Sequence, residues 1–122
     1  MGKVVCCKMN IKIFNTPKQV SNELSSYIIS KYILRRKNIA MSGGSTPIML
    51  FKEISKKLKK TEKIESNFYW IDERCVLPKS KESNFKTAND YLFKKIKIDK
   101  KIFTELKEKI TPTMNKKDIQ KY

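Results

Sequence analysis

The ten residues from 38 to 47 have the sequence Asn38-Ile39-Ala40-Met41-Ser42-Gly43-Gly44-Ser45-Thr46-Pro47. A short apolar run is followed by two glycines, two hydroxyl residues and a proline, after which apolar residues recur with helical period. This order predicts a strand, a tight turn and the start of a helix, with Thr46 as its cap and Pro47 in its first turn. The glycines can adopt positive φ and allow a ligand to approach the backbone closely.

A helix that begins in this way can bind an anion. Its free N–H groups and the positive end of its dipole favour a phosphate, which makes the turn a candidate phosphate-binding site. An ordinary capped turn could have the same sequence. The stretch is not a Walker loop, because no Gly-Lys-Ser or Gly-Lys-Thr follows, and it lacks the dinucleotide-binding fingerprint.

The composition is that of one globular domain. The chain has 122 residues, of which 39% are hydrophobic and 10% aromatic, enough for a single core. No apolar run is long enough to cross a membrane and no secretory signal pattern is present, so we expect a soluble protein of the cytoplasm. Three cysteines and no histidine do not match the usual zinc sites, and we expect free thiols in a reducing compartment.

The formal charge of +16 raises the question of nucleic-acid binding, since a basic surface attracts polyanions. The charge is spread along the whole chain, however, and comes from 25 lysines and only three arginines, Arg35, Arg36 and Arg74. Arginine makes most bidentate contacts to phosphates and bases, so a dedicated nucleic-acid reader is disfavoured. We expect solvated lysines on helix faces, with only non-specific nucleic-acid binding at low salt.

The N-terminal region divides into a lead-in over residues 1–8 and a predicted strand over residues 9–14. Gly2 with the pair Cys6-Cys7 resembles a dual-acylation signal, although that signal requires Ser or Thr at position 6; an apolar lead-in packed against the domain is the alternative. Residues 9–14 alternate apolar and polar side chains, which predicts a first strand, with an edge position in the sheet as one option.

Three helices are predicted from apolar residues that recur with helical period. The first begins at Thr16-Pro17 and ends near Arg36, the second follows Pro47, and the third begins at Ser83-Asn84. Their predicted buried faces consist of Val20, Leu24, Tyr27, Ile28 and Tyr32 in the first, Leu50, Phe51, Ile54 and Leu58 in the second, and Phe85, Ala88, Leu92 and Ile96 in the third.

The two central strands are predicted at residues 39–42 and 67–71, and the second is continuously apolar, as in a strand buried on both faces of a parallel sheet. It ends in Asp72-Glu73-Arg74, at the carboxyl end where α/β sheets place their ligands. Either these residues form a solvated loop with a simple ion pair, or Arg74 binds a phosphate and a carboxylate orients it. On an extended chain, at most one of Asp72 and Glu73 shares the side of Arg74.

The remaining sequence adds one candidate site residue and some ambiguous segments. Asn84 is either a site residue or only part of a helix cap. Residues 98–109 alternate lysine with apolar residues without a clear period, and residues 115–122 are typical of the opening of a helix. No repeat or linker divides the chain, so residues 9–122 are predicted to belong to one domain.

The predicted order of elements corresponds to the first half of a doubly wound α/β domain. Within that order, three segments resemble the 6-phosphogluconolactonases. Ser42-Gly43-Gly44-Ser45-Thr46-Pro47 is similar to the first signature of that family, Trp70-Ile71-Asp72-Glu73-Arg74-Cys75-Val76 is similar to the second, and Ser83-Asn84 follows at the expected place. Three motifs in order are far more specific than one, and the resemblance covers roughly residues 9–122.

The resemblance implies a doubly wound, mostly parallel sheet with helices on both faces, related to the glucosamine-6-phosphate deaminases and ribose-5-phosphate isomerases. It implies hydrolysis of 6-phosphogluconolactone to 6-phosphogluconate in the oxidative pentose phosphate pathway, without a metal or an organic cofactor. The deaminases have Asp-Glu-Tyr where this chain has Asp72-Glu73-Arg74, which favours the lactonase branch. Carried over to this chain, the implied site consists of Asp72 in a catalytic role, Arg74 on the phosphate, and Gly43, Gly44, Ser45, Thr46 and Asn84 around the substrate.

One departure from the family concerns the catalytic base, which is a histidine in a later Asp-Gly-His segment, whereas this sequence contains no histidine. Asp72 or Glu73 could replace it as the base only in surroundings that disfavour its charge. We therefore expect an N-terminal half of a lactonase domain, its C-terminal half missing, that binds sugar phosphate weakly and turns over little. Half of such a sheet exposes a strand edge and apolar helix faces, which predicts self-association.

Three alternative functions stay open at this point. A sugar-phosphate deaminase or isomerase would use ring-opening or enolisation chemistry on a related substrate. A non-catalytic relative would keep only the sugar-phosphate site. A basic nucleic-acid-binding module, supported only by the net charge, would show tight binding with a steep salt dependence.

Overall fold

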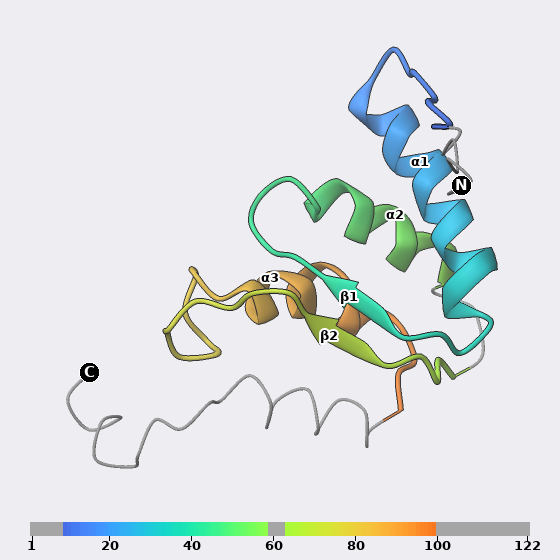
Figure 1. The fold of residues 1–122 in the computed structure, drawn as a ribbon. Coiled ribbons are helices and arrows are strands. Elements are labelled where there is room, and N and C mark those ends of the chain that lie inside the picture. The colour runs from blue at the N-terminus through green and yellow to red at the C-terminus, as the bar shows by residue number, and fades with distance from the viewer. Residues whose placement is uncertain (1–8, 59–62, 100–122) are drawn as a thin grey trace, which may run out of the picture.

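The computed structural model of the chain describes residues 9–58 and 63–99, and the predictions for residues 1–8 and 115–122 lie outside these ranges. In chain order, the elements are α1 (Pro17–Ile28), a π-helical segment (Ile29–Ile33), β1 (Ile39–Met41), α2 (Ile48–Leu58), β2 (Phe68–Trp70), α3 (Asn84–Tyr91) and a 3-10 turn (Phe93–Lys95). Figure 1 shows the two strands side by side, and α2 packs against both α1 and α3.

The two strands form a parallel pair in which Ile39 lies opposite Phe68 and Met41 lies opposite Trp70. Because α2 connects them, they form a β-α-β unit, and the predicted α/β class with a parallel sheet is confirmed. Ile64 and Ile98 form an isolated bridge that is also parallel. Ile98 is the first residue of the segment 98–109, for which the sequence pattern is ambiguous.

One face of the strand pair carries the core. The rings of Phe68 and Phe93 lie 5.2 Å apart between centroids, and those of Trp70 and Phe85 lie 6.4 Å apart. On the other face, Tyr69 is 40% exposed. The prediction that this strand is buried on both faces is therefore wrong, because the described helices cover only the face that carries Phe68.

The predicted core faces of α2 and of the third helix are confirmed. Leu50 is half-buried, and the other predicted residues of both faces are buried. They pack with the buried residues of the strands and of the segment that follows α1. The buried apolar core consists of Ile29, Ile33, Met41, Phe51, Ile54, Leu58, Ile64, Phe68, Phe85, Ala88, Leu92, Phe93 and Ile96.

The helix starts agree with the sequence signals to within a residue. Thr16 caps α1, with its hydroxyl accepting from the N–H of Gln19 at 3.2 Å, and Ser83 caps α3 in the same way. In α2 the first helical bond runs from the N–H of Phe51 to the carbonyl of Pro47, so that helix begins one residue later than predicted from Thr46.

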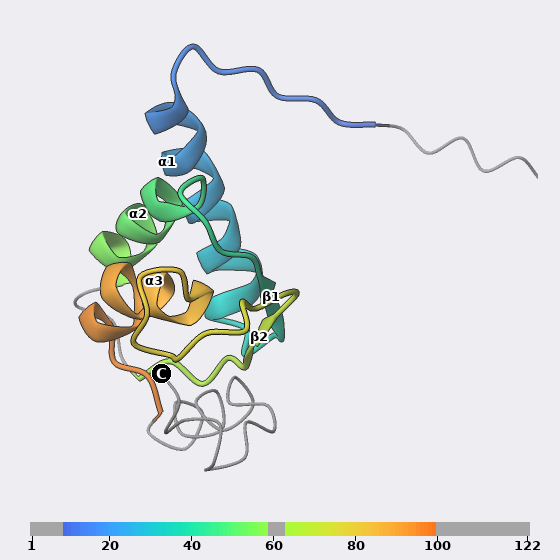
Figure 2. The same ribbon diagram turned by 90° about the vertical axis from the view of Figure 1, so that its left-hand side faces the viewer.

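The predicted strand over residues 9–14 is not formed. These residues are extended but belong to no strand, and the side chains of Met9, Ile11 and Ile13 are 80%, 71% and 91% exposed. A strand needs a hydrogen-bonded neighbour, and in the described structure β1 and β2 pair only with each other. Figure 2 shows this segment leading away from the body.

The predicted buried face of α1 is also wrong. Ser21 and Ser25 are the buried residues of this helix, whereas Val20, Leu24, Tyr27 and Tyr32 are at least 40% exposed. The cause lies on α2, where the ammonium group of Lys57 donates to the carbonyl of Asn22 and to the hydroxyls of Ser25 and Ser26 at 2.6–2.7 Å. These bonds hold the polar face of α1 against α2, and the π-helical segment then shifts the helical phase, which brings Ile29 and Ile33 into the core.

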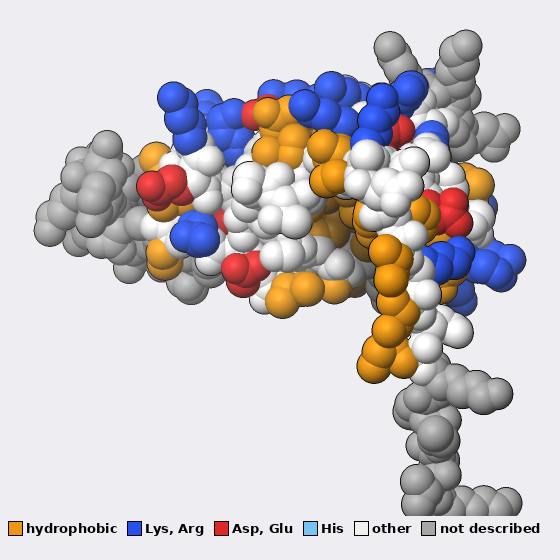
Figure 3. All heavy atoms as spheres, turned by 90° about the horizontal axis from the view of Figure 1, so that it is seen from above, with side chains coloured by type: hydrophobic (Ala, Val, Ile, Leu, Met, Phe, Trp, Pro, Cys, Tyr) orange, Lys and Arg blue, Asp and Glu red, His pale blue; other side chains and the backbone are white. Residues whose placement is uncertain are grey.

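The surface carries the charge that the composition predicts. Figure 3 shows Lys and Arg side chains gathered along one side of the molecule seen from above. Lys52 and Lys56 of α2 are exposed, as predicted, and Cys75 is a free, exposed thiol. Within the described ranges, the structure contains no helix of sufficient length and apolarity to cross a membrane.

Candidate functional site

The turn between β1 and α2 contains both glycines of the predicted phosphate-binding site, and the structure requires them for different reasons. Gly44 has φ of 89°, in the left-handed region, while the space next to its Cα is open. Gly43 lies against α3, and a Cβ atom added to it would overlap the side chain of Asn84. The first glycine therefore permits close packing, and the second permits the turn.

The charged turn after β2 is attached to the start of α3 through Glu73. One carboxylate oxygen accepts from the N–H of Asn84 at 2.8 Å and from that of Arg74 at 2.7 Å. The other oxygen accepts from the N–H of Phe85 at 2.8 Å and from the hydroxyl of Ser83 at 3.2 Å. A carboxylate at this position satisfies the free N–H groups of the helix start and interacts favourably with its dipole.

Asn84 joins the two turns. The nitrogen of its side-chain amide group donates to the carbonyl of Asp72 at 3.1 Å, and the same side chain packs against Gly43. We call this arrangement of Gly43, Glu73 and Asn84 the latch. It brings the glycine turn and the charged turn together at the carboxyl ends of the two parallel strands, where α/β sheets bind their ligands.

Asp72 and Arg74 are both exposed beside the latch. Neither side chain forms an ion pair with another residue in the described part of the chain, so the interpretation of this turn as a simple ion pair is not supported. Arg74 therefore presents its charge to solvent in the charged turn after β2.

The other predicted site residues also lie at the carboxyl ends of the strands, and they differ in how far they are buried. Ser45 and Thr46 are exposed in the turn before α2, and Gly44 is exposed next to them. Asn84 is buried at the first position of α3, so it belongs to the helix start and contacts the turn as well. The described structure thus brings the glycine turn, Asp72, Arg74 and Asn84 to one edge of the sheet.

Sequence reasoning did not find the role of Glu73, which it treated as an alternative to Asp72. Its four hydrogen-bonded partners include residues ten to twelve positions further along the chain. The available signal was an acidic residue at the end of a strand, followed by a Ser-Asn helix start that needs an acceptor.

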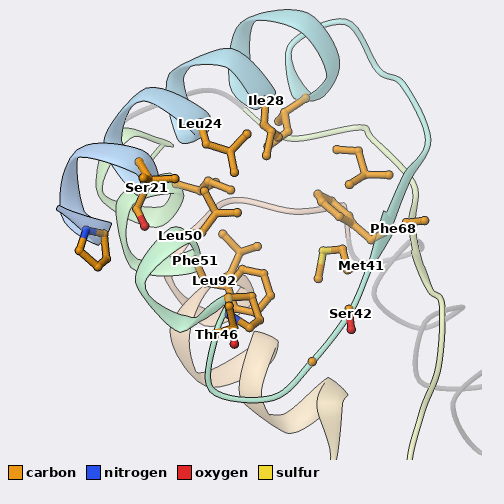
Figure 4. A pocket seen from close by; sticks show the side chains of 18 of the residues that line it. Ser21, Leu24, Ile28, Met41, Ser42, Thr46, Leu50, Phe51, Phe68 and Leu92 are labelled. Atoms are coloured by element: carbon orange, nitrogen blue, oxygen red, sulfur yellow. The ribbon is translucent and has the colours of Figure 1, made fainter. Parts of the chain in front are cut away.

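A groove of about 870 Å³ lies between α1, α2 and β1 (Figure 4). Its walls are mostly apolar, and Ser42, Gly43 and Thr46 lie at one end. Asp72 and Arg74 do not line it. An apolar groove does not suit a sugar phosphate, so the candidate site is the polar edge beside the latch and the groove is a separate feature.

A parallel β-α-β unit with a glycine turn and a charged turn at the carboxyl ends of its strands defines an α/β protein, a class whose members commonly bind ligands at that edge. Comparison with known proteins specifies the class further. Residues 15–122 match the family described as glucosamine-6-phosphate isomerases/6-phosphogluconolactonase, and the chain belongs to this family.

Individual relatives agree with this assignment. The chain is 33% identical over 94 residues to a 6-phosphogluconolactonase of Haemophilus influenzae, covering 74% of this chain and 40% of that protein. It is 31% identical over 78 residues to a glucosamine-6-phosphate deaminase of Corynebacterium urealyticum, covering 63% of this chain and 30% of that protein. The crystal structure of the devB protein superimposes with a TM-score of 0.64 and 38% identity, over 75% of this chain and 40% of that one. The chain thus spans less than half the length of these relatives.

Proposed function

We propose that this chain provides the sugar-phosphate-binding part of a cytoplasmic 6-phosphogluconolactonase, which hydrolyses 6-phosphogluconolactone to 6-phosphogluconate. The observation that carries the proposal is the convergence of the glycine turn, Arg74 and the start of α3 at one edge of a parallel sheet. The 6-phosphogluconolactonases among the relatives support this substrate, and the unpaired charge of Arg74 supports an anionic ligand.

In this proposal, each residue of the edge has a separate task. Arg74 binds the phosphate, and the exposed turn residues Gly44, Ser45 and Thr46 line the sugar-phosphate pocket together with Gly43. Asn84 positions the turn through its contact with Gly43 and its bond to the Asp72 carbonyl.

The chemistry requires water to add to the lactone carbonyl, after which the ring C–O bond breaks and the ring oxygen takes up a proton. A base must accept the proton of the attacking water. Glu73 is held by four hydrogen bonds, whereas the described structure shows none to the carboxylate of Asp72. Asp72 is therefore the carboxylate we assign to the catalytic machinery. With no histidine in the chain, we expect little turnover by these residues alone.

A direct test measures binding of 6-phosphogluconate, the stable product, to the 122-residue chain by calorimetry. Arg74→Gln should weaken binding at least tenfold, the loss expected for one charge-assisted phosphate contact of about 1.5–3 kcal/mol. Arg35→Gln removes the same charge at an exposed position away from the site and is the matched control. Gluconate without the phosphate should bind no better to the wild type than to Arg74→Gln. Equal affinities of the two variants for 6-phosphogluconate would contradict the proposal, because binding would then reflect only the general positive charge.

The second candidate function is that of a sugar-phosphate deaminase, which the Corynebacterium relative supports. A substrate panel separates the two candidates. A lactonase site should prefer 6-phosphogluconate over glucosamine 6-phosphate, and the opposite preference would favour the deaminase. Binding of both sugars without turnover of either lactone or amine would leave a sugar-phosphate-binding protein.

A further inference from the structure

The strand pair does not by itself determine where Arg74 lies. Just beyond β2, the N–H of Ile71 still donates to the carbonyl of Met41 at 2.9 Å. Within residues 9–58 and 63–99, no backbone hydrogen bond joins the following residues 72–76 to the glycine turn. Arg74 comes three residues after Ile71, which corresponds to about 10 Å of extended chain. Its position therefore depends on contacts that the charged turn forms outside the strand pair.

The backbone of Arg74 is held on both sides. The N–H of Arg74 donates at 2.7 Å to Oε1 of Glu73, and the carbonyl of Arg74 accepts from the N–H of Val76, also at 2.7 Å. The side chain of Arg74, in contrast, is exposed. An arginine with a fixed backbone and a free guanidinium group can bind an anion without first ordering its main chain, which lowers the entropic cost of binding.

The oxygen that holds Arg74 also holds the start of α3. Oε1 of Glu73 accepts from the N–H of Asn84 at 2.8 Å, and Asn84 is buried. The helix behind it packs against α2. Asn84 in turn contacts Gly43, so one carboxylate connects Arg74 through α3 to the glycine turn. The two parts of the proposed phosphate site are thus placed relative to each other by Glu73 and Asn84.

Glu73 is poorly suited to contact a sugar phosphate itself. Its two oxygens already accept from four donors, and its negative charge would repel a phosphate. A carboxylate that only capped α3 would require no bond to the N–H of Arg74. The double use of Oε1 therefore indicates a task in the charged turn in addition to the helix cap.

We propose that Glu73 is a positioning residue for phosphate binding, which holds the backbone of Arg74 at the start of α3 and does not contact the ligand. This inference rests on the proposed function, in which Arg74 binds the phosphate. It predicts an effect opposite in sign to that of simple electrostatics. By charge alone, removal of the carboxylate next to Arg74 should strengthen the binding of an anion. If Glu73 positions Arg74, the same removal should weaken it.

Calorimetry with 6-phosphogluconate tests this sign. Glu73→Gln keeps the size of the side chain but replaces one acceptor oxygen by an NH2 group, which cannot accept from an N–H. We expect binding to weaken about fivefold. Glu82→Gln removes the same charge from an exposed residue close to the same helix start and should not weaken binding. Unchanged or tighter binding by Glu73→Gln, or equal weakening by both variants, would overturn the proposal.

A double variant separates positioning of Arg74 from a general loss of structure. If Glu73 acts through Arg74, Glu73→Gln should have little further effect in a chain that already carries Arg74→Gln. An equal loss of affinity in both backgrounds would overturn this inference alone, because the effect of Glu73 would then not pass through Arg74. If Arg74→Gln binds 6-phosphogluconate as well as the wild type does, the proposed function fails and this inference fails with it.

Amide hydrogen exchange, followed by NMR, provides a measurement without ligand. Exchange at the N–H of Arg74 should become about tenfold faster in Glu73→Gln, whereas the N–H of Ile39, bonded within the strand pair, should be unaffected. Unchanged exchange at Arg74 would overturn the proposal. Should Glu73→Gln fail to fold, Glu73→Asp serves in the same measurements. It keeps the charge at the helix start but is one methylene shorter, so it should also weaken binding and speed exchange at Arg74, and the absence of both effects would overturn the proposal.

Discussion

Two regions beside α2 differ in how completely they are packed. Near its start, the latch satisfies polar groups with one carboxylate, and Gly43 and Asn84 pack without space between them. Along its side, the helix faces an apolar groove of about 870 Å³. The first region is complete within residues 9–58 and 63–99, and the second has apolar walls that no side chain from these residues covers. The comparison indicates that the proposed site can be tested in this chain alone, whereas substitutions along the groove test whether anything fills it.

The largest effect is expected from Glu73→Ala in the latch. The substitution removes the acceptor of three backbone N–H groups and one hydroxyl, and Asn84 and Phe85 are buried, so water replaces the lost bonds poorly. We expect the free energy of unfolding to fall by about 3 kcal/mol, the range for a lost charged cap that leaves buried donors unsatisfied. Chemical denaturation of the full chain measures it.

Glu82→Ala is the matched control for this measurement, because it removes the same charge from an exposed residue close to the same helix start. We expect it to change stability by less than about 0.5 kcal/mol. Similar losses of unfolding free energy in the two variants would show that Glu73 does not anchor the start of α3.

The next effect is expected from Gly43→Ala, where the new methyl group overlaps Asn84. Overpacking of this kind should cost about 2 kcal/mol of stability and weaken sugar-phosphate binding, because the two turns must separate. Gly44→Ala is the comparison. Its neighbourhood is open, so only the positive φ opposes the methyl group, at a cost of about 1 kcal/mol. Thermal unfolding of both variants shows which substitution lowers the stability more.

A double variant identifies the cause of the Gly43→Ala effect. Asn84→Ala removes two of the three side-chain atoms that the new methyl group would overlap. If close packing is the cause, the cost of Gly43→Ala should be smaller in the Asn84→Ala background than in the wild type. Additive costs would mean that the glycine is required for another reason.

A smaller and pH-dependent effect is expected on the surface of α3. Asp90 accepts from Lys86 and, at 2.7 Å, from Lys94, and these bonds lower the pKa of its carboxyl group below the ordinary value of 3.8. A lowered pKa in the folded state stabilises the protein above the unfolded-state pKa, and this contribution disappears as pH falls through the folded-state value. Asp90→Asn should therefore cost about 0.5 kcal/mol at neutral pH for two partly exposed pairs spaced four residues apart. The difference from wild type should vanish in denaturant titrations below the lowered pKa, and a difference that persists there would contradict the assignment to these pairs.

The sequence predicts the parts of the structure that depend on neighbouring residues. Thr16 and Ser83 cap their helices because the signal and its partner lie within one turn. The role of Glu73 could not be predicted in this way, since its partners on α3 lie ten or more residues away. The same applies to α1, whose orientation is set by Lys57, more than thirty residues from the serines that it contacts. Periodicity identifies the apolar residues of a helix but does not determine which other element contacts them.

The last comparison concerns the two walls of the groove. Leu24 is 40% exposed there, so Leu24→Ser alters a side chain that is only partly buried and should lower the free energy of unfolding by about 1 kcal/mol at concentrations where the chain is monomeric. Ile54→Ser, on the other wall of the same groove, alters a side chain that is only 4% exposed and should cost about 3 kcal/mol. Denaturation of both variants at several protein concentrations tests whether the groove is filled. If Leu24→Ser is as destabilising as Ile54→Ser in dilute solution, the groove is already filled within one chain. If its cost grows with concentration, a second copy fills it.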